Sequence, residues 1–540
     1  MSGTAAYIFL YTFPVFCRKS VVGSCKNQTQ VLKNTVILFR LSFFMCTFAV
    51  IFQAGTSVLR FAVMVHLQWP ALFSRHQYAF TMNRFRHLAL AAISACFALH
   101  ATAQEVGTDV HGRSTTYEWP TDAKVLEKLD QWRDLKFGVI FHWGLYAVPG
   151  IVESWSICSE DVDWIGRRWD MPYDEYKKWY WGLKDQFNPT EFDPVKWAEI
   201  MQDGGMKYMV FTTKHHDGFC MYDSKYTDFS IAKHAFKDNP KRDVARWVFD
   251  AFRQQGMWVG CYFSKPDWHS EWFWNPHYAT PDRRPNYKLD RHPEWWLSFK
   301  EFTKKQLTEL TTDYGALDIL WLDGGWVKGD DVDLDEVLRG ARQRHPGLLC
   351  VDRAVPGKNE NYQTPERGIP EVQLDNPWES CITLSNDWGW VPNAPYKSAQ
   401  KVLNTLIEVT AKGGALLLGV GPTAQGTIEQ PIVDRLQTLG AWLRTNGKAI
   451  YGTRNAKVYH DGNVWFTADK DGKTLYAIYA LPEGESLPAE IQWKGNAPKG
   501  KVRLLANGKS LKAKTKKNVT TVQLPKGLAQ EALVLEFQMK

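Results

Sequence analysis

Polar and aromatic residues follow one short apolar run after another through the middle of this sequence. The runs alternate with helical patterns, which is typical of parallel strands buried on both faces. The groups at their ends are His142-Trp143-Gly144, Lys214-His215-His216-Asp217-Gly218, Tyr262 with Lys265, Asp267 and Trp268, Trp321-Leu322-Asp323-Gly324-Gly325-Trp326, and Asp352-Arg353. Side chains at the carboxyl ends of parallel barrel strands gather at one edge. Core packing alone does not explain five such groups, so the sequence predicts one shared site.

The residue types in these groups narrow the chemistry. A zinc hydrolase needs converging ligands, but the neighbours His215 and His216 point to opposite sides of an extended chain, and the sequence has no HxH or HExxH motif. It also has no Gly-x-Ser-x-Gly turn, and Gly419-Val420-Gly421 lacks the further Gly and the Lys of a phosphate loop. Carboxylates among His, Arg and Trp remain. They suit glycoside hydrolysis, in which one carboxylate attacks the anomeric carbon and another protonates the leaving oxygen.

The strands and helices that would position these residues can be predicted from the alternation of short apolar runs with helical patterns. Strands are predicted at 137–142, 208–213, 258–263, 319–323, 348–353 and 415–420. One helix should begin at Asp193-Pro194, a capping Asp before a Pro at the first helical position, and end at Gly204-Gly205. Further helices are predicted near 242–255, 294–314, 398–412 and 431–445. Repeated strand–helix units indicate an α/β fold with a (β/α)8-like, TIM-type barrel, made irregular if only six strands are present.

After about Gly452 the pattern changes to short segments in which apolar and polar residues alternate. Asp471-Gly472 and Asn507-Gly508 are two-residue hairpin turns between short alternating segments. We therefore predict a catalytic barrel over residues 104–452, followed by a C-terminal antiparallel β-sandwich domain over residues 453–540.

The first hundred residues suggest an export signal behind an upstream extension. Met82 opens a short basic segment, an apolar stretch follows at 88–99, and Ala101-Thr102-Ala103 forms a small-x-small cleavage site before Gln104. We expect residues 82–103 to be a signal peptide, residues 1–81 to be spurious upstream sequence, and the chain to cross the inner membrane into the periplasm. Two alternatives are a membrane anchor at 36–52, which Arg40 interrupts, and lipoprotein processing at Cys96. Once the signal peptide is removed, we expect no stable membrane span in the mature chain.

Composition excludes several classes of protein. Aromatic residues make up 14% of the chain, with 25 Trp, and Trp can fill a core or stack on sugar rings. Nine Cys are scattered singly without a CxxC pair, which argues against a disulfide framework and a structural zinc site. The net charge of +7 is small, and several positive residues fall at the two ends of the chain. We therefore expect no nucleic-acid partner.

Four segments together resemble a known family. They are Phe141-His142-Trp143-Gly144, Lys214-His215-His216-Asp217-Gly218-Phe219, Leu320-Trp321-Leu322-Asp323-Gly324, and Trp378-Glu379-Ser380-Cys381 followed by Trp388-Gly389-Trp390. These segments are similar to the α-L-fucosidases of glycoside hydrolase family 29, over residues 115–455 in full and over the C-terminal domain more loosely.

The resemblance implies roles for the residues at matching positions. It makes Asp323 the nucleophile. It implies that a further set contacts fucose: His142, His215, His216, Tyr262, Trp321 and Arg353. Trp390 takes the place of the Tyr in the Trp-Gly-Tyr motif of the family and would lie near the fucose methyl group.

The acid/base is not fixed by the resemblance, because its position varies within the family. Glu366 lies on a loop 43 residues after Asp323, and we prefer it because loops over the barrel mouth supply the acid in similar enzymes. Glu379 is the alternative, and it could instead be a hydrogen-bonded support of the pocket. Glu153, beside Trp155, is a further candidate sugar contact.

The sequence thus predicts a retaining exo-glycosidase that removes terminal α-L-fucosyl residues, in α-1,3, α-1,4 or related linkages, through a covalent fucosyl-aspartate. We expect fucosylated oligosaccharides or glycoconjugates as partners and no cofactor or metal. The alternatives are a glycosidase for a fucose-like sugar such as L-galactose, an inactive glycan-binding protein, or a metal-dependent hydrolase with an ion at His215 or His216. Linkage preference and oligomeric state are not encoded in these patterns.

Overall fold

The computed structural model describes residues 114, 116–158, 170–280, 282–528 and 531–539. The predicted signal peptide at 82–103 and the extension at 1–81 lie outside the described residues. Within the described part of the chain, no helix combines the length and the apolar character needed to cross a membrane.

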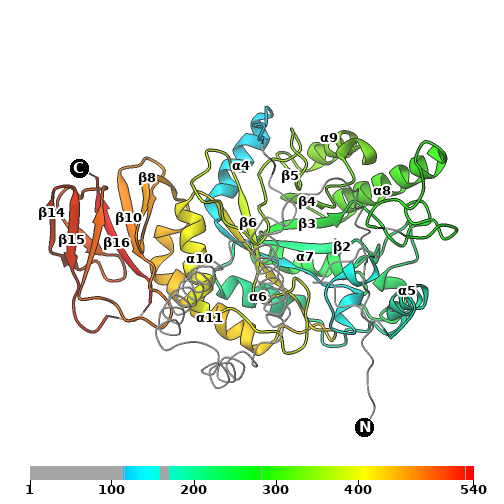
Figure 1. Cartoon of the computed structure of the whole chain (residues 1–540), viewed down its shortest axis with the longest axis horizontal. Coiled ribbons are helices and arrows are strands. Elements are labelled where there is room, and N and C mark those ends of the chain that lie inside the picture. Colours follow the sequence, from blue (N-terminus) through cyan, green and yellow to red (C-terminus); the bar gives the residue numbers. More distant parts are fainter. Residues whose placement is uncertain (1–113, 115, 159–169, 281, 529–530, 540) are drawn as a thin grey trace, which may run out of the picture. The chain divides into compact units, whose positions relative to one another are not determined.

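A sheet of seven parallel strands forms the wall of a TIM-like barrel (Figure 1). The strands are β1 (Phe137–Phe141), β2 (Tyr208–Lys214), β3 (Trp258–Ser264), β4 (Ile319–Asp323), β5 (Leu349–Asp352), β6 (Glu379–Thr383) and β7 (Ala415–Val420). Their order is β5-β4-β3-β2-β1-β7-β6, so consecutive strands β1 to β5 are neighbours and the last two join the other edge. The predicted barrel class is confirmed, and β6 is a strand that the sequence pattern did not reveal.

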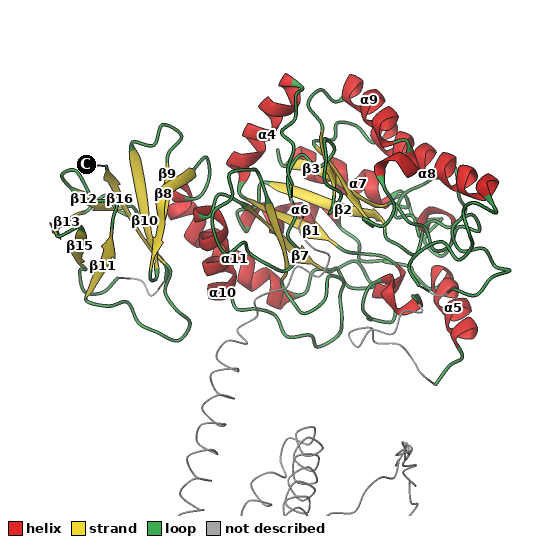
Figure 2. Cartoon of the chain, turned by 45° about the horizontal axis from the view of Figure 1, so that its top comes forward, coloured by secondary structure: helices red, strands yellow, loops and turns green. Residues whose placement is uncertain are grey.

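The helices around this sheet are α4 (Ala123–Leu135), α5 (Tyr173–Gly182), α6 (Pro194–Asp203), α7 (Val244–Gln254), α8 (Pro293–Asp313), α9 (Leu334–Arg344), α10 (Ala399–Ala411) and α11 (Gln430–Asn446). Most of the helices pack around the outside of the sheet, whereas α4 packs against the barrel interior and α5 lies beside two short 3-10 helices, away from the strands (Figure 2). Short 3-10 helices lie at Leu145–Ala147, Ser154–Ile157, Leu183–Asp185, Ile231–Lys233, Gly329–Val332 and Gly447–Ala449. Asp193 caps α6 as expected, since its carboxylate accepts from the backbone N–H groups of Val195 and Lys196.

Alternate residues of each strand serve two different cores. On β1, Phe137, Val139 and Phe141 pack toward the helices, whereas Ile140 packs into the barrel interior. Trp132 of α4 lies in the interior cluster, 6.5 Å between ring centroids from Tyr208, the first residue of β2, so α4 closes the interior at the opposite end from the strand-end residues. A filled interior leaves the carboxyl ends of the strands as the open face.

An extended segment at 360–367 bridges the edges formed by β5 and β6. It pairs with β5 through Glu360 and with β6 through Gln363 and Glu366, in single bridges. The Cys381 N–H donates to the Pro365 carbonyl at 3.3 Å, and the Arg367 N–H donates to the Cys381 carbonyl at 2.8 Å. Glu366 is therefore held between two backbone hydrogen bonds.

The C-terminal domain consists of two antiparallel sheets. One has the order β13-β12-β16-β10-β9-β8, and the other has the order β11-β15-β14. Their strands are β8 (Arg454–Asp461), β9 (Val464–Ala468), β10 (Thr474–Tyr479), β11 (Glu490–Lys494), β12 (Val502–Leu504), β13 (Ser510–Leu511), β14 (Ala513–Lys516), β15 (Val519–Gln523) and β16 (Leu533–Gln538). Trp493 of one sheet stacks on Phe537 of the other with centroids 5.8 Å apart, so the sheets share a core, as a sandwich does.

Candidate active site

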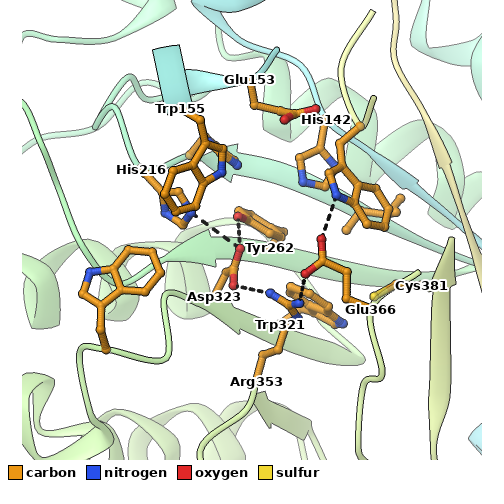
Figure 3. A pocket seen from close by; sticks show the side chains of 14 residues that line it. His142, Glu153, Trp155, His216, Tyr262, Trp321, Asp323, Arg353, Glu366 and Cys381 are labelled. Carbon is orange, nitrogen blue, oxygen red and sulfur yellow. Dashed lines mark hydrogen bonds and ion pairs between the residues drawn. The ribbon is translucent and has the colours of Figure 1, made fainter. Parts of the chain in front are cut away.

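A pocket opens where the barrel strands end, and it gathers residues from all five of the predicted strand-end groups (Figure 3). Its lining residues are Ile140, His142, Glu153, Trp155, His215, His216, Tyr262, Trp321, Asp323, Trp326, Arg353, Glu366, Cys381 and Trp388. Asp323 is the last residue of β4, and Tyr262 lies on the neighbouring strand β3. The strand ends thus bring together residues that are more than 200 positions apart in sequence.

Asp323 is oriented by donors on both of its oxygens. Oδ1 accepts from the Gly324 backbone N–H at 2.8 Å and from Arg353 Nη1 at 2.9 Å. Oδ2 accepts from the Tyr262 hydroxyl at 2.7 Å and lies 3.8 Å from His216 Nε2. Burial raises the pKa of Tyr262, and the charge of Asp323 raises it further, so the phenol stays a donor at neutral pH. These contacts favour an ionised, rigidly oriented carboxylate.

Arg353 joins the two carboxylates of the pocket. Its Nη1 donates to Asp323 and its Nη2 donates to Glu366 (Figure 3). Burial alone would lower the pKa of Arg353, but the charges of Glu366 and Asp323 outweigh burial and raise it. One guanidinium therefore neutralises part of the charge on both carboxylates and fixes their separation.

Glu366 is held on its other oxygen by a tryptophan. Trp388 Nε1 donates to Glu366 Oε1 at 3.0 Å, while Arg353 donates to Oε2. The segment that carries Glu366 is pinned to β6 by the backbone bonds of Pro365 and Arg367 described above. The glutamate thus lies in the pocket wall on a fixed strand-like segment, whereas the sequence suggested a free loop.

Three histidines form the side of the pocket near β1 and β2. Burial lowers the pKa of His142, and the neighbouring His215 lowers it further. Burial lowers the pKa of His215 to about 4, and its Nδ1 shares a hydrogen bond of 2.6 Å with Ser154 Oγ. Both rings are therefore neutral at pH 7. A neutral imidazole can both donate and accept, which suits contacts to sugar hydroxyls.

Tryptophans form an aromatic wall that the sequence analysis did not assign as a unit. Trp155 and Trp326 lie with their ring centroids 5.9 Å apart, and each lies 5.1 Å from His216. Trp326 could be predicted, because it belongs to the strand-end group of Asp323. Trp155 could not, because it lies on a short 3-10 helix and no sequence pattern places that helix at the barrel mouth. Their flat apolar faces suit the C–H face of a sugar ring.

Glu153 was a candidate sugar contact, and it lines the pocket. Its Oε1 accepts from the Gly389 backbone N–H at 2.7 Å. Burial raises the pKa of Glu153 to about 7, although the Gly389 hydrogen bond opposes that rise. The carboxyl therefore ties the segment before Trp155 to the turn that carries Trp388.

The structure puts Trp390 outside this pocket and Trp388 in its wall. The Glu153–Gly389 hydrogen bond holds the turn between the two tryptophans. Trp390 then faces Gly150, while the Trp388 indole reaches Glu366. Of the two tryptophans in this motif, the structure brings Trp388 and not Trp390 to the pocket.

Glu379 also lies outside the pocket lining, buried beneath it at the start of β6. Its oxygens accept from the Tyr208 hydroxyl at 2.7 Å and from Trp321 Nε1 at 3.1 Å. Burial raises the pKa of Glu379 to about 7, against these two hydrogen bonds. Trp321 in turn stacks on Tyr262 with centroids 5.3 Å apart, so Glu379 supports the two aromatic residues behind Asp323.

The arrangement suits acid–base and nucleophilic chemistry on a small polar ring. It presents two carboxylates, neutral histidines and aromatic faces in one pocket. Among the described residues, no group of three or more His, Cys, Asp or Glu side chains is arranged to hold a metal ion.

Comparison with known proteins matches this geometry to one family. The family model described as Alpha-L-fucosidase covers residues 105–448, more than half of the chain. The human plasma α-L-fucosidase is 29% identical over 384 residues, which cover 65% of this chain and 76% of that protein. The α-L-fucosidase of Dictyostelium discoideum is 27% identical over 371 residues, covering 65% and 77% of the two chains.

Solved structures give the same result. The α-L-fucosidase isoenzyme 1 of Paenibacillus thiaminolyticus is 30% identical, with a TM-score of 0.65, and the match covers 77% of this chain and all of that one. A Thermotoga maritima α-fucosidase in complex with fucose is 29% identical, with a TM-score of 0.63, and the match covers 78% and 100% of the two chains. The chain belongs to the α-L-fucosidases, the enzymes of glycoside hydrolase family 29.

Proposed function

We propose that the enzyme removes terminal α-L-fucosyl residues from oligosaccharides or glycoconjugates, in α-1,3, α-1,4 or related linkages, with retention of configuration. In this proposal Asp323 is the nucleophile and Glu366 is the acid/base. The sugar is held by the remaining predicted contacts: His142, His215, His216, Tyr262, Trp321 and Arg353. Trp388 replaces Trp390 as the aromatic contact.

The first half-reaction follows from the donors around Asp323. Gly324 and Arg353 anchor Oδ1, so Oδ2, on the side of Tyr262 and His216, attacks the anomeric carbon. The bond from that carbon to the leaving oxygen breaks as Glu366 transfers its proton to the leaving oxygen. The products are a fucosyl-Asp323 ester, the free aglycone and an ionised Glu366.

The second half-reaction reverses these roles. Glu366 takes a proton from water, the water oxygen attacks the anomeric carbon, and the bond to Asp323 breaks. Asp323 returns as a carboxylate and Glu366 as an acid, so two displacements retain the configuration. Arg353 contacts both carboxylates and can follow the transfer of charge between them without moving.

The observation that carries this proposal is the bridge from Arg353 to both Asp323 and Glu366. Retaining glycosidases need their carboxyl groups about 5–5.5 Å apart, and a guanidinium that donates to one carboxylate from each terminal nitrogen favours a short separation. A Bacteroides thetaiotaomicron α-L-fucosidase of family 29, 26% identical to this chain, has been solved as a trapped covalent intermediate. That relative supports a covalent route here.

Two other functions use the same pocket. A glycosidase for L-galactose would need room for one extra hydroxyl at C6, next to Trp388 in this proposal. A glycan-binding protein would keep the pocket but not turn substrate over. The presence of Asp323 and Glu366 on one guanidinium favours catalysis over binding alone.

One set of substrates tests these functions. The enzyme should hydrolyse an aryl α-L-fucoside or fucosylated oligosaccharides, and the anomer released first, followed by NMR, should have the α configuration. Equal kcat/KM on the matching α-L-galactoside would contradict fucose selectivity. Tight binding of fucose without any hydrolysis would favour the glycan-binding protein.

We also propose that residues 82–103 direct export, that the mature chain starts near Gln104 and enters the periplasm, and that residues 104–452 and 453–540 are its two domains. Lipid attachment at Cys96 is the alternative form of export. Human, Pongo abelii and Rattus norvegicus relatives are named plasma α-L-fucosidases, which supports an exported enzyme. Peptide mass spectrometry of protein from the native host tests this, and peptides from residues 1–81 would contradict it.

A further inference from the structure

The positive charge of this protein is concentrated in one part of the C-terminal domain. Residues 491–530 contain ten Lys and Arg and no Asp or Glu, whereas the whole chain of 540 residues has a net charge of only +7. The remainder of the chain therefore carries a small negative charge. Such a window is unusual on a protein with 58 acidic residues, and it calls for a structural explanation.

Strand register places many of these lysines on one face of the three-stranded sheet. Trp493 of β11 is opposite Thr520 of β15, and both point into the sandwich core. Because successive residues of a strand alternate between faces, Lys494 points outward beside Val519. Lys516 of β14 is opposite Val519 from the other side, so it shares that outer face.

The same alternation puts Lys512 and Lys514 on the outer face of the β14 edge, while Lys517 lies in the two-residue turn before β15. We define the basic face as Lys494, Lys512, Lys514, Lys516 and Lys517, all of which are exposed. With neighbouring strands about 4.8 Å apart and alternate residues about 7 Å apart along a strand, these charges form a two-dimensional array.

The basic face is not neutralised by its own surroundings. None of the five lysines forms a salt bridge with any residue that the structure describes. Two carboxylates close by in the sheet bind other groups: Asp461 accepts from the Lys494 backbone N–H at 2.6 Å, and Glu490 accepts from the side chains of Gln492 and Gln523. Lysine on an exposed edge strand can also serve to block strand pairing. Because β11 and β14 are the two edges of this sheet, that role applies to Lys494, Lys514 and Lys516, but it does not explain Lys517 in the turn before β15.

We infer that the basic face is a docking surface for an acidic polysaccharide, a glycan chain that carries carboxylate or sulfate groups. Charge complementarity requires a polyanion. Among the described residues of the C-terminal domain, no large hydrophobic side chain is exposed, and the basic face consists of lysines alone, so it offers nucleic-acid bases no aromatic platform and a membrane no apolar side chain to insert. A flat array of flexible ammonium groups suits a regularly charged chain.

Docking would place the barrel on its substrate, a step that rests on the proposed fucosidase function. A polymer bound through the C-terminal domain raises the local concentration of its fucosyl branches around the pocket. The basic face thus lowers KM for fucosyl groups on an acidic polymer without touching the reacting atoms. Small neutral fucosides would gain nothing.

The test is binding of the whole chain to dextran sulfate, with neutral dextran of equal length as the control polymer. One variant carries Lys494→Gln, Lys514→Gln and Lys516→Gln. Its matched control carries Lys178→Gln, Lys196→Gln and Lys237→Gln, exposed barrel lysines that form no salt bridge with described residues. Hydrolysis of an aryl fucoside is measured for each protein, because it reports the proposed function independently of docking.

The wild type should bind dextran sulfate in a salt-dependent manner and ignore neutral dextran. The basic-face variant should lose about tenfold or more in affinity and show a weaker salt dependence, whereas the control variant should bind like the wild type. All three should hydrolyse the aryl fucoside equally. Equal affinity of the two variants would overturn the inference, as would binding to anionic phospholipid vesicles or duplex DNA but not to dextran sulfate. Failure of the wild type to hydrolyse both the aryl fucoside and fucosylated oligosaccharides would refute the proposed function and leave the docking result standing.

Discussion

The Tyr262 hydroxyl donates a hydrogen bond of 2.7 Å to Oδ2 of Asp323. The contact arises because β3 and β4 are neighbouring parallel strands, with Ser264 in register with Asp323 and Tyr262 two residues earlier. The phenol thus orients the oxygen that we propose as the nucleophile. Its loss should disturb the chemistry more than the fold.

Tyr262→Phe tests this relationship. A hydrogen bond to a charged group contributes about 1.5–3 kcal/mol, so kcat should fall by about 10- to 100-fold. Tyr208→Phe is the matched control, because it removes an equally short, buried hydroxyl contact to Glu379 without touching Asp323. It should leave kcat nearly unchanged while lowering Tm. Similar losses of kcat in both variants would show that burial of the hydroxyl, and not its bond to Asp323, matters.

Replacing either candidate acid should slow hydrolysis, but only for the true acid/base should the size of the effect depend on the leaving group. Glu366→Ala should reduce hydrolysis of natural oligosaccharides by about 10² to 10⁴-fold, because their leaving oxygen needs a proton. An activated aryl fucoside should suffer much less in its first step. Glu379→Ala should weaken both substrates in similar proportion, since Glu379 supports Trp321 and Tyr208 beneath the pocket.

Steady-state kinetics of both variants on both substrates decide between these roles, with the pH profile as a second readout. Glu366→Ala should lose the basic limb of the profile. If Glu379→Ala shows the leaving-group dependence instead, the two assignments must be exchanged.

Glu379 should also make stability depend on pH. Burial raises its pKa to about 7 from an ordinary value of 4.5, so the folded chain keeps a proton that the unfolded chain releases. The stability that Glu379 contributes is therefore present below pH 4.5 and is lost as pH rises through 7. The full change is on the order of 3 kcal/mol.

Glu379→Gln removes this titration. The Tm of the variant relative to the wild type should increase between pH 5 and pH 8, as measured by calorimetry. Glu127→Gln, at an exposed position on α4, should show a constant difference over the same range. A constant difference for Glu379→Gln as well would mean that Glu379 is already ionised in the folded chain.

Much of the barrel could be predicted because its strands are continuous apolar runs with polar ends. The strand β6 was missed because Glu379 and Ser380 interrupt its apolar pattern. Both are nevertheless buried: Glu379 is satisfied by Tyr208 and Trp321, and the Ser380 hydroxyl donates to the Gly368 carbonyl at 2.6 Å. Tyr208 and Trp321 come from distant parts of the chain, so no local pattern could reveal that Glu379 has buried partners.

The residues of the pocket, like the strands of the barrel, could be predicted only in part. Residues at strand ends, such as Asp323 and Arg353, follow from the fold class once the strands are known. Residues from connecting segments do not, because their positions depend on long-range contacts such as the one between Glu153 and Gly389. That contact decides that Trp388, and not Trp390, faces Glu366.

The central claim is that Asp323 forms a covalent bond to the sugar. The most direct measurement is peptide mass spectrometry after reaction with 2-fluoro-fucosyl fluoride. The fluorine at C2 slows both steps, and the fluoride leaving group speeds only the first, so the covalent intermediate accumulates. The account predicts a fluorofucosyl adduct on the peptide that contains Asp323, and no adduct in an Asp323→Asn variant. An adduct on Glu366 or Glu379, or complete turnover with inverted configuration and no adduct, would contradict it.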